Sequence, residues 1–256
     1  MTFEGKIAAI TGGGTGIGKE VARALLERGA TVVINGRRAE VLTAAASELD
    51  PTGERIATVA GSIADPSVAS QLIQTAVERF GGLDILINNA GIFKPTAFLE
   101  HTHEDLDRYL DIILKGTFYA SQSAVPEMQK RGSGAIVNVG SMWADHAVGA
   151  TPSSAYSAAK AGVHALTRNL AIEFASDKIR VNAVAPAVVE TPVYGTFLSE
   201  EQVAEVLPTF NEFHPIGRNG QPRDVSEAIL YLAGDGAGWI TGAVLPVDGG
   251  VTAGRG

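Results

Sequence analysis

The sequence predicts a single α/β domain built around a doubly wound, parallel β-sheet. Short apolar segments rich in β-branched residues alternate with longer segments of helical periodicity, a pattern typical of parallel strands joined by crossover helices. With 256 residues, of which 45% are hydrophobic, the chain is long enough to bury one full core. The sequence contains no internal repeat, low-complexity tract or Pro/Ser-rich linker, so we expect one domain over residues 1–256.

Seven segments have the composition of strands. They are residues 6–11, 31–34, 55–60, 83–89, 134–140, 179–185 and 243–248. The fourth and fifth contain the runs LDILI and AIVNV, which are nearly continuous in apolar residues. Such runs indicate strands that are covered on both faces.

Six segments carry Ala, Leu and Val at three-to-four spacing, flanked by Gly or Pro, and are predicted to be the crossover helices. They are residues 16–28, 38–49, 66–80, 106–130, 155–175 and 222–234. The longest stretch without a clear pattern is 187–221. Because long irregular segments in compact domains are usually functional, we expect it to act as a substrate lid.

The composition argues against several functional classes. With 28 acidic and 20 basic residues, the formal net charge of −8 disfavours binding to nucleic acid or to anionic membranes. Zero cysteines exclude disulfides and thiolate metal sites, which fits a cytoplasmic protein. Neither a signal-peptide pattern nor an apolar run of roughly 18 residues is present, so we expect no membrane association.

A glycine-rich segment, TGGGTGIG at 11–18, joins the first predicted strand to the first predicted helix. Glycines there let the backbone approach a pyrophosphate, and the helix N-terminus favours anions. We therefore predict a dinucleotide site with contacts from Gly12, Gly14, Thr15, Gly16, Ile17 and Gly18. The spacing GxxxGxG differs from the common GxGxxG, and a plain tight turn is the alternative interpretation.

The residues after the second predicted strand bear on the choice of dinucleotide. An acidic residue at this point would bind the ribose hydroxyls of NAD, whereas a basic residue would accept the 2′-phosphate of NADP. The sequence has Asn35-Gly36-Arg37-Arg38 and no carboxylate. Arg37 and Arg38 therefore predict a preference for NADP(H) over NAD(H), unless they are simply solvated charges at a helix start.

Further motifs extend over essentially the whole chain. They are NNAG at 88–91, IVNVGS ending at Ser141, YSAAK at 156–160, RVNAVAP at 180–186, Thr191 and ITGAVLPVDGG at 240–250. Together with the glycine-rich turn, their order and spacing resemble the short-chain dehydrogenase/reductase family. The resemblance implies a Rossmann fold and hydride transfer between a nicotinamide cofactor and a secondary alcohol or ketone.

The resemblance implies three catalytic roles: Tyr156 as general acid/base, Ser141 as the group that orients the substrate oxygen, and Lys160 as a ligand of the nicotinamide ribose. Tyr156 and Lys160 are four residues apart on a predicted helix, so the ammonium can also favour the tyrosinate. Each residue alone is also compatible with an ordinary structural role. Additional cofactor contacts implied by the family are Ser62, Ile63, Asn89, Ala90, Gly91, Pro186, Val189 and Thr191.

The sequence departs from the family pattern at Ile113, where an asparagine is usual. That asparagine is associated with a local helix distortion and a proton-relay water. Isoleucine cannot hydrogen-bond a water and favours a regular helix, so we expect a reduced distortion and a weaker relay. Ser62 stands where an aspartate is common, and Ala187 replaces a glycine.

Two histidine-containing segments need interpretation. The fourteen residues between Ser141 and Tyr156 include Trp143, Asp145 and His146; we expect this loop to border the substrate and His146 to be solvated. His101 and His103 flank Thr102. This segment is better explained as a helix start capped by Thr102 than as a metal site formed by the two histidines, and we predict no metal.

Three functional readings remain open at this point: an NADP(H)-preferring oxidoreductase, its NAD-dependent equivalent, and a dinucleotide-binding sensor with little turnover. The candidate lid mixes Val, Leu and aromatic residues with few charges, which suggests an apolar or neutral substrate. The family resemblance further implies a homotetramer.

Overall fold

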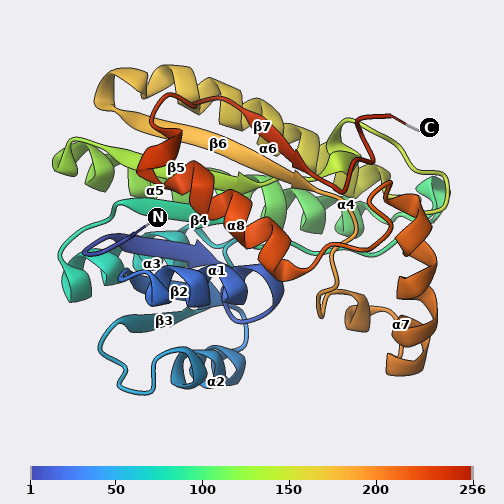
Figure 1. Ribbon diagram of the computed structural model, residues 1–256, viewed down its shortest axis with the longest axis horizontal. Helices are drawn as coiled ribbons and strands as arrows, with labels where there is room; N and C mark the ends of the chain where they lie inside the picture. Colours follow the sequence, from blue (N-terminus) through green and yellow to red (C-terminus); the bar gives the residue numbers. More distant parts are fainter. Residues whose placement is uncertain (1, 255–256) are drawn as a thin grey trace.

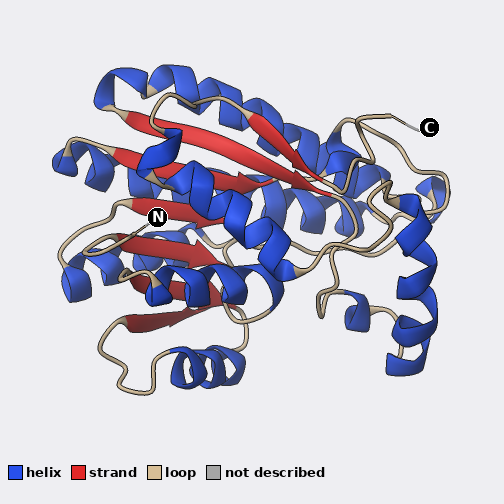
Figure 2. Cartoon of the chain, in the orientation of Figure 1, coloured by secondary structure: helices blue, strands red, loops and turns tan. Residues whose placement is uncertain are grey.

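Seven parallel strands form one continuous sheet in the order β3-β2-β1-β4-β5-β6-β7, in a computed structural model that describes residues 2–254 (Figures 1 and 2). The strands are β1 Ile7–Thr11, β2 Thr31–Gly36, β3 Ile56–Ala60, β4 Ile85–Asn88, β5 Gly134–Val139, β6 Ile179–Pro186 and β7 Val244–Val247. The doubly wound α/β prediction is confirmed, and each strand begins and ends within two residues of its predicted limits.

Helices cover both faces of this sheet, as the apolar strands required. They are α1 Gly16–Glu27, α2 Ala39–Leu49, α3 Pro66–Phe80, α4 His103–Tyr109, α5 Gly116–Arg131, α6 Ser154–Glu173, α7 Glu200–Val206 and α8 Pro222–Ala233. In β1, Ala8 and Ile10 pack with α1, α2 and α8, whereas Ile7 and Ala9 pack with α3 and α5. Strict alternation along the strand thus divides the core into two layers.

The helix predicted over 106–130 is not one regular helix. α4 and α5 are separated by a π-helical turn at Leu110–Lys115, in which the backbone N–H of Gly116 donates to the carbonyl of Asp111, five residues back. Thr102 caps α4 through a reciprocal pair with Asp105, as predicted for a cap.

The expectation that Ile113 would reduce the local distortion is therefore wrong. Its side chain, 1% exposed, packs with Tyr109, Ala155, Ala159 and Val163, and the Thr117 hydroxyl donates to its carbonyl at 2.7 Å. Apolar packing against α6 and a hydroxyl from the next turn hold the wider turn without a polar side chain at residue 113.

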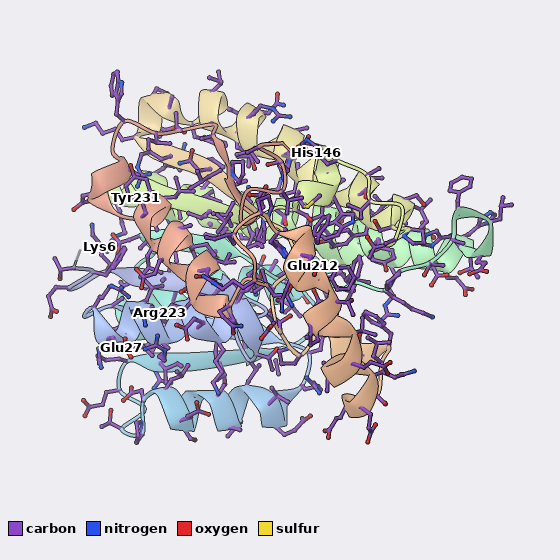
Figure 3. The ribbon with its side chains drawn as sticks, turned by 45° about the vertical axis from the view of Figure 1, so that its right-hand side comes forward. Lys6, Glu27, His146, Glu212, Arg223 and Tyr231 are labelled. Carbon is purple, nitrogen blue, oxygen red and sulfur yellow. The ribbon has the colours of Figure 1, made fainter. Side chains whose placement is uncertain are left out.

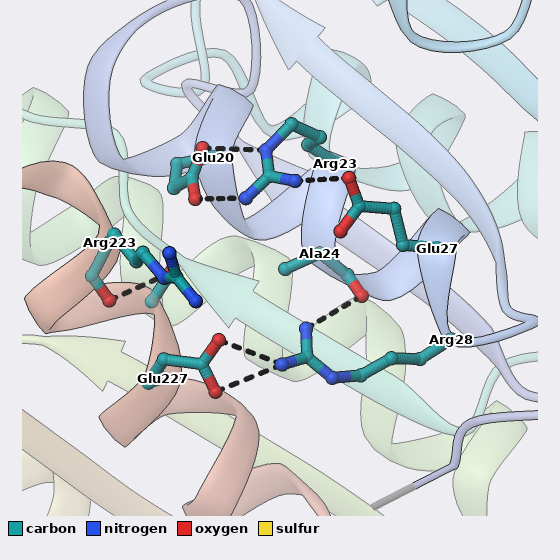
Figure 4. Close-up of polar contacts among 8 residues, drawn as sticks. Glu20, Arg23, Ala24, Glu27, Arg28, Arg223 and Glu227 are labelled. Carbon is teal, nitrogen blue, oxygen red and sulfur yellow. Dashed lines mark hydrogen bonds and ion pairs between the residues drawn. The ribbon is translucent and has the colours of Figure 1, made fainter.

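Helices α1 and α8 lie side by side on the same face of the sheet and are joined by one ion pair (Figure 4). Arg28 of α1's C-cap pairs with Glu227 of α8 at 2.7 Å, and Arg23 binds Glu20 and Glu27 within α1. These charges are partly exposed, so each pair adds little stability. Buried apolar residues such as Val21, Leu25 and Ile229 supply most of the contact that fixes α1.

The segment 187–221 is not irregular, contrary to the prediction. It contains α7 and two short 3₁₀ helices, Tyr194–Thr196 and Leu207–Phe213. Ser199 caps α7 reciprocally with Gln202, a signal present in the sequence. In Figure 1, α7 (orange) lies beyond the carboxyl ends of the strands.

Within residues 2–254, no helix is both long enough and apolar enough to cross a membrane.

Candidate active site

A cavity of about 470 Å³ lies at the carboxyl ends of the strands. It includes the point between the neighbouring strands β1 and β4, from which the chain continues to β2 on one side and to β5 on the other. This is where ligands bind in doubly wound sheets. The cavity runs from the β1–α1 turn and the end of β2 to the residues after β5 and β6. Of the predicted site residues, its lining includes Gly12, Gly14, Thr15, Gly16, Ile17, Arg37, Arg38, Ser62, Ile63, Asn89, Ala90, Gly91, Tyr156, Lys160, Pro186, Val189 and Thr191.

The glycine-rich turn is held rigidly against the end of β4. The Thr11 hydroxyl accepts from the backbone N–H groups of Asn89 and Ala90 at 3.0 and 2.9 Å. The Asn89 side chain donates to the carbonyls of Thr11 and Gly12 at 3.0 and 3.1 Å. Asn89 thus fixes the turn as well as lining the cavity.

The N-terminus of α1 is open to an anion. Thr15 is its N-cap, in an extended conformation and without a side-chain hydrogen bond to the first turn. Gly16 has a positive φ of 53°, which a larger residue would adopt only at a cost. Uncapped N–H groups and the helix dipole fit a pyrophosphate group.

Gly18 does not line the cavity, unlike the other glycines assigned to cofactor binding. A Cβ atom at this position would lie 2.3 Å from the Gly12 carbonyl oxygen and 2.5 Å from the Asn89 amide. Gly18 therefore allows α1 to pack closely against the turn, a role the sequence pattern did not separate from ligand contact.

The end of the cavity beside β2 is basic. Arg37 and Arg38 are exposed, and Arg38 is the N-cap of α2, whose first turn has no side-chain cap. Below them, the Asn35 side chain donates to the carbonyls of Val59 and Gly61 at 3.0 and 3.1 Å, joining β2 to the end of β3. Val41 and Leu42 complete this end of the lining and were not predicted.

At the other end, α6 presents Tyr156 and Lys160 one helical turn apart. The Lys160 ammonium, 5% exposed, donates to the Val139 carbonyl at 2.5 Å and lies 5.7 Å from the centre of the Tyr156 ring. Ser141 follows β5 and is buried behind the lining of the cavity, where its hydroxyl accepts from the backbone N–H of Trp143 at 3.2 Å. The Ser141 hydroxyl is close enough to the Tyr156 phenol to influence its pKa, so the three residues singled out for catalysis lie together.

The electrostatics of this group depend mainly on burial. Removal from water raises the pKa of Tyr156 to about 12, and the Ser141 hydroxyl opposes that shift. Burial lowers the pKa of Lys160 to about 8. At neutral pH the Tyr156 phenol is therefore protonated, and the Lys160 side chain is still charged in most molecules.

A buried polar network lies behind the site and begins at Asn88 of the NNAG motif. The Asn88 side chain of β4 donates to Asn138 of β5 at 2.8 Å and to Ser121 of α5 at 3.1 Å. Asn138 in turn donates to the Thr167 hydroxyl of α6 at 2.9 Å. This network joins β4, β5 and α6, and so positions the helix that carries Tyr156.

Four aromatic side chains line the cavity near Tyr156; we define them as the aromatic wall, which consists of Phe93, Trp143, Tyr194 and Phe210. The Phe93 ring meets the Tyr156 ring edge to face, with centroids 5.0 Å apart. The Trp143 indole, 7% exposed, donates to the Thr151 hydroxyl at 3.0 Å and closes the loop after Ser141 on itself.

The loop prediction is partly confirmed. Trp143 borders the cavity as expected, and His146 is exposed at the surface (Figure 3). Asp145 points instead to the buried His164, and its carboxylate lies 3.0 Å from the ring Nδ1. Phe93 follows the NNAG motif by two residues and carried no recognisable signal of its own.

Comparison with known proteins adds independent evidence. Residues 12–252 match a family described as enoyl-(acyl carrier protein) reductase. The chain is 44% identical over 256 residues to a cis-4-hydroxycyclohexanecarboxylate dehydrogenase of Sinomonas cyclohexanicum, covering 98% of each chain. It is 36% identical to a cyclohexanol dehydrogenase of an Acinetobacter strain, covering 98% of this chain and 96% of that one.

The fold is equally similar to a crystal structure of a short-chain type dehydrogenase/reductase from Mycobacterium marinum. The TM-score is 0.90 at 32% identity, with 99% of this chain and 98% of that chain covered.

Proposed function

The chain belongs to the short-chain dehydrogenase/reductase family and is an NAD(P)-dependent oxidoreductase, and we propose that it interconverts a secondary alcohol and its ketone with NADP(H). One observation carries the proposal: Tyr156 and Lys160 line one end of a cavity, with Ser141 buried directly behind Tyr156, and the other end is an uncapped, glycine-rich helix N-terminus. When bound, the nicotinamide supplies or accepts the hydride.

Each side chain has a distinct proposed role. The Tyr156 phenol, protonated at neutral pH, donates its proton to the ketone oxygen, and takes it back from the alcohol in the reverse direction. Ser141 orients that oxygen beside the phenol. Lys160, fixed by the Val139 carbonyl, binds the ribose and stabilises the tyrosinate once it forms.

The cofactor preference rests on the basic end of the cavity. Arg37 and Arg38 follow β2 with no carboxylate between Asn35 and Arg38, and the first turn of α2 lacks a side-chain cap. Two guanidiniums and a helix N-terminus suit a 2′-phosphate, which carries negative charge, better than two ribose hydroxyls. Ser62 and Ile63 would contact the adenine.

The substrate class follows from the aromatic wall. The aromatic side chains of Phe93, Trp143 and Phe210 suit an apolar ring better than an extended charged chain. Two relatives bear names that refer to six-membered ring alcohols, cyclohexanol and hydroxycyclohexanecarboxylate. We therefore propose a cyclic secondary alcohol as substrate, with 187–221 acting as the lid that covers it.

The test is turnover by the purified protein with NADPH and with NADH, against cyclohexanone and a panel of acyclic and charged ketones. We expect NADPH oxidation to be fastest with the neutral cyclic ketones. Tight NADPH binding without oxidation of NADPH by any ketone would instead favour the hypothesis of a dinucleotide-binding sensor. A tenfold or greater preference for NADH would favour the NAD-dependent oxidoreductase.

We also propose a homotetramer, because several large apolar side chains are exposed on the outer helices. They include Phe118 on α5, Ile172 on α6 and Trp239, which is 100% exposed. Tyr231 on α8, labelled in Figure 3, is another. Light scattering on the purified protein should give the mass of four chains, and a monomer would contradict the proposal.

A further inference from the structure

His164 lies on the same face of α6 as the two catalytic residues of that helix. Tyr156, Lys160 and His164 are spaced four residues apart, so they form one row along the helix. The His164 side chain is 1% exposed and takes no part in the site described so far. A buried imidazole in this row needs a physical account.

Its hydrogen bonds determine its tautomer. The backbone N–H of Ser141 donates to Nε2 at 3.4 Å, and Nδ1 lies 3.0 Å from the Asp145 carboxylate. A backbone amide can only donate, so Nε2 must hold a lone pair. The ring is therefore neutral, with its proton on Nδ1 donated to Asp145.

The ring also fills the space beside the chain segment that carries Ser141. A Cβ atom on Gly140 would lie 2.2 Å from His164 Nε2, so the imidazole packs directly on the backbone at Gly140. On one side of this glycine, Lys160 binds the Val139 carbonyl at 2.5 Å; on the other, His164 binds the Ser141 amide. Two residues of α6 thus hold the backbone at both ends of a three-residue segment.

We propose that His164, oriented by Asp145, is a positioning residue that holds Ser141 beside Tyr156 and does so only while its ring is neutral. The inference rests on the proposed function, because Ser141 matters only if it orients the substrate oxygen. It also links the loop that carries Trp143, the aromatic wall's indole, to the acid/base pair, since Asp145 belongs to that loop.

The proposal has a pH dependence of defined sign. Protonation at Nε2 would place a second N–H opposite the backbone N–H of Ser141. Because two donors cannot hydrogen-bond to each other, the Ser141 amide would be released. Burial lowers the pKa of His164 below its usual 6.5, Asp145 opposes the shift, and Lys160 and Arg168 add to it. The ring is then neutral at neutral pH, so the loss of positioning is confined to the acid side of that value.

The test compares two substitutions at this position. His164→Leu removes the acceptor, and we expect turnover to fall about tenfold or more while the dissociation constant for NADPH stays within about threefold. His164→Gln can present an amide oxygen near the position of Nε2 and does not titrate. It should recover turnover to within about threefold of wild type, and its pH profile should lack the acid limb due to His164.

Two further variants serve as controls. Asp145→Asn keeps an oxygen that accepts from Nδ1 but removes the charge, so the acid limb should move to lower pH. His146→Gln, at the exposed neighbour of Asp145, should leave the pH profile unchanged. Equal losses of turnover in stably folded Leu and Gln variants, or an acid limb that persists in His164→Gln, would overturn the proposal.

A measurement without turnover separates this inference from the proposed function. Imidazole ¹⁵N resonances should report a neutral ring protonated at Nδ1, and the Ser141 amide proton should shift in His164→Leu but much less in His164→Gln. An Nε2-protonated ring would refute the inference even in an active enzyme. The expected NMR result with no ketone reduced would refute only the proposed function.

Discussion

The two ends of the cavity differ in how they are built. The cofactor end is made from turns that directly follow β1, β2 and β4. The side chains of Thr11 and Asn89 fix these turns by hydrogen bonds to backbone groups. The substrate end is made from α6, the loop after β5 and the helical segment after β6, together with Phe93 after the NNAG motif, and aromatic side chains line it. The cofactor end thus suits a ligand that does not vary. The shape of the substrate end, in contrast, can be altered by substituting a few side chains.

Tyr156→Phe, at the junction of the two ends, should have the largest effect. It removes the transferable proton but keeps the ring that packs on Phe93. Turnover should fall about 100-fold or more, while the NADPH dissociation constant stays within about threefold. Steady-state kinetics and a fluorescence titration measure the two quantities. Turnover close to that of wild type would remove Tyr156 from the mechanism.

Sequence alone indicated which residues the structure brings together at the glycine-rich end, because short local motifs specify them. Gly16 and Thr15 follow a strand and open a helix, and that context carries the chemistry. The substrate end was located only as a region, because Phe93, Trp143 and Phe210 come from three separate segments that only the fold brings together. The same limit hid His164, whose partners Ser141 and Asp145 lie 23 and 19 residues away.

Arg37→Asp tests the cofactor end. A carboxylate can accept from ribose hydroxyls but repels a 2′-phosphate, so the ratio of kcat/KM for NADP to that for NAD should fall at least about tenfold, or about 1.4 kcal/mol. The ratio is its own control, because a general loss of activity affects both cofactors. An unchanged ratio would mean that Arg37 is only a solvated charge.

Phe210→Ala tests the substrate end. Loss of one ring from the aromatic wall should raise KM for cyclohexanone about fivefold to tenfold, consistent with about 1 kcal/mol of lost apolar contact. The KM for NADPH should not change. Phe98→Ala, at an exposed aromatic outside the cavity, is the matched control. An equal rise in the KM for acetone would argue against a ring-binding wall.

Ile113→Asn should have the smallest effect on turnover. The π-helical turn exists with isoleucine, so asparagine is not needed to form it. A polar amide among Tyr109, Ala159 and Val163 should instead lower the free energy of unfolding by about 1–3 kcal/mol. A chemical denaturation curve measures this cost. A variant of unchanged stability with faster turnover would show that the missing asparagine does limit proton transfer.

In the proposed reaction, NADPH bound in this cavity would supply a hydride to a ketone carbon while Tyr156 supplies the proton. Single-turnover reactions with cyclohexanone and NADPH deuterated at C4, on either face, test it directly by mass spectrometry of the product. We expect cyclohexanol carrying one deuterium at the carbinol carbon from one labelled face only, and almost no product with Tyr156→Phe. Product without deuterium from either label, or equal yield from Tyr156→Phe, would contradict it.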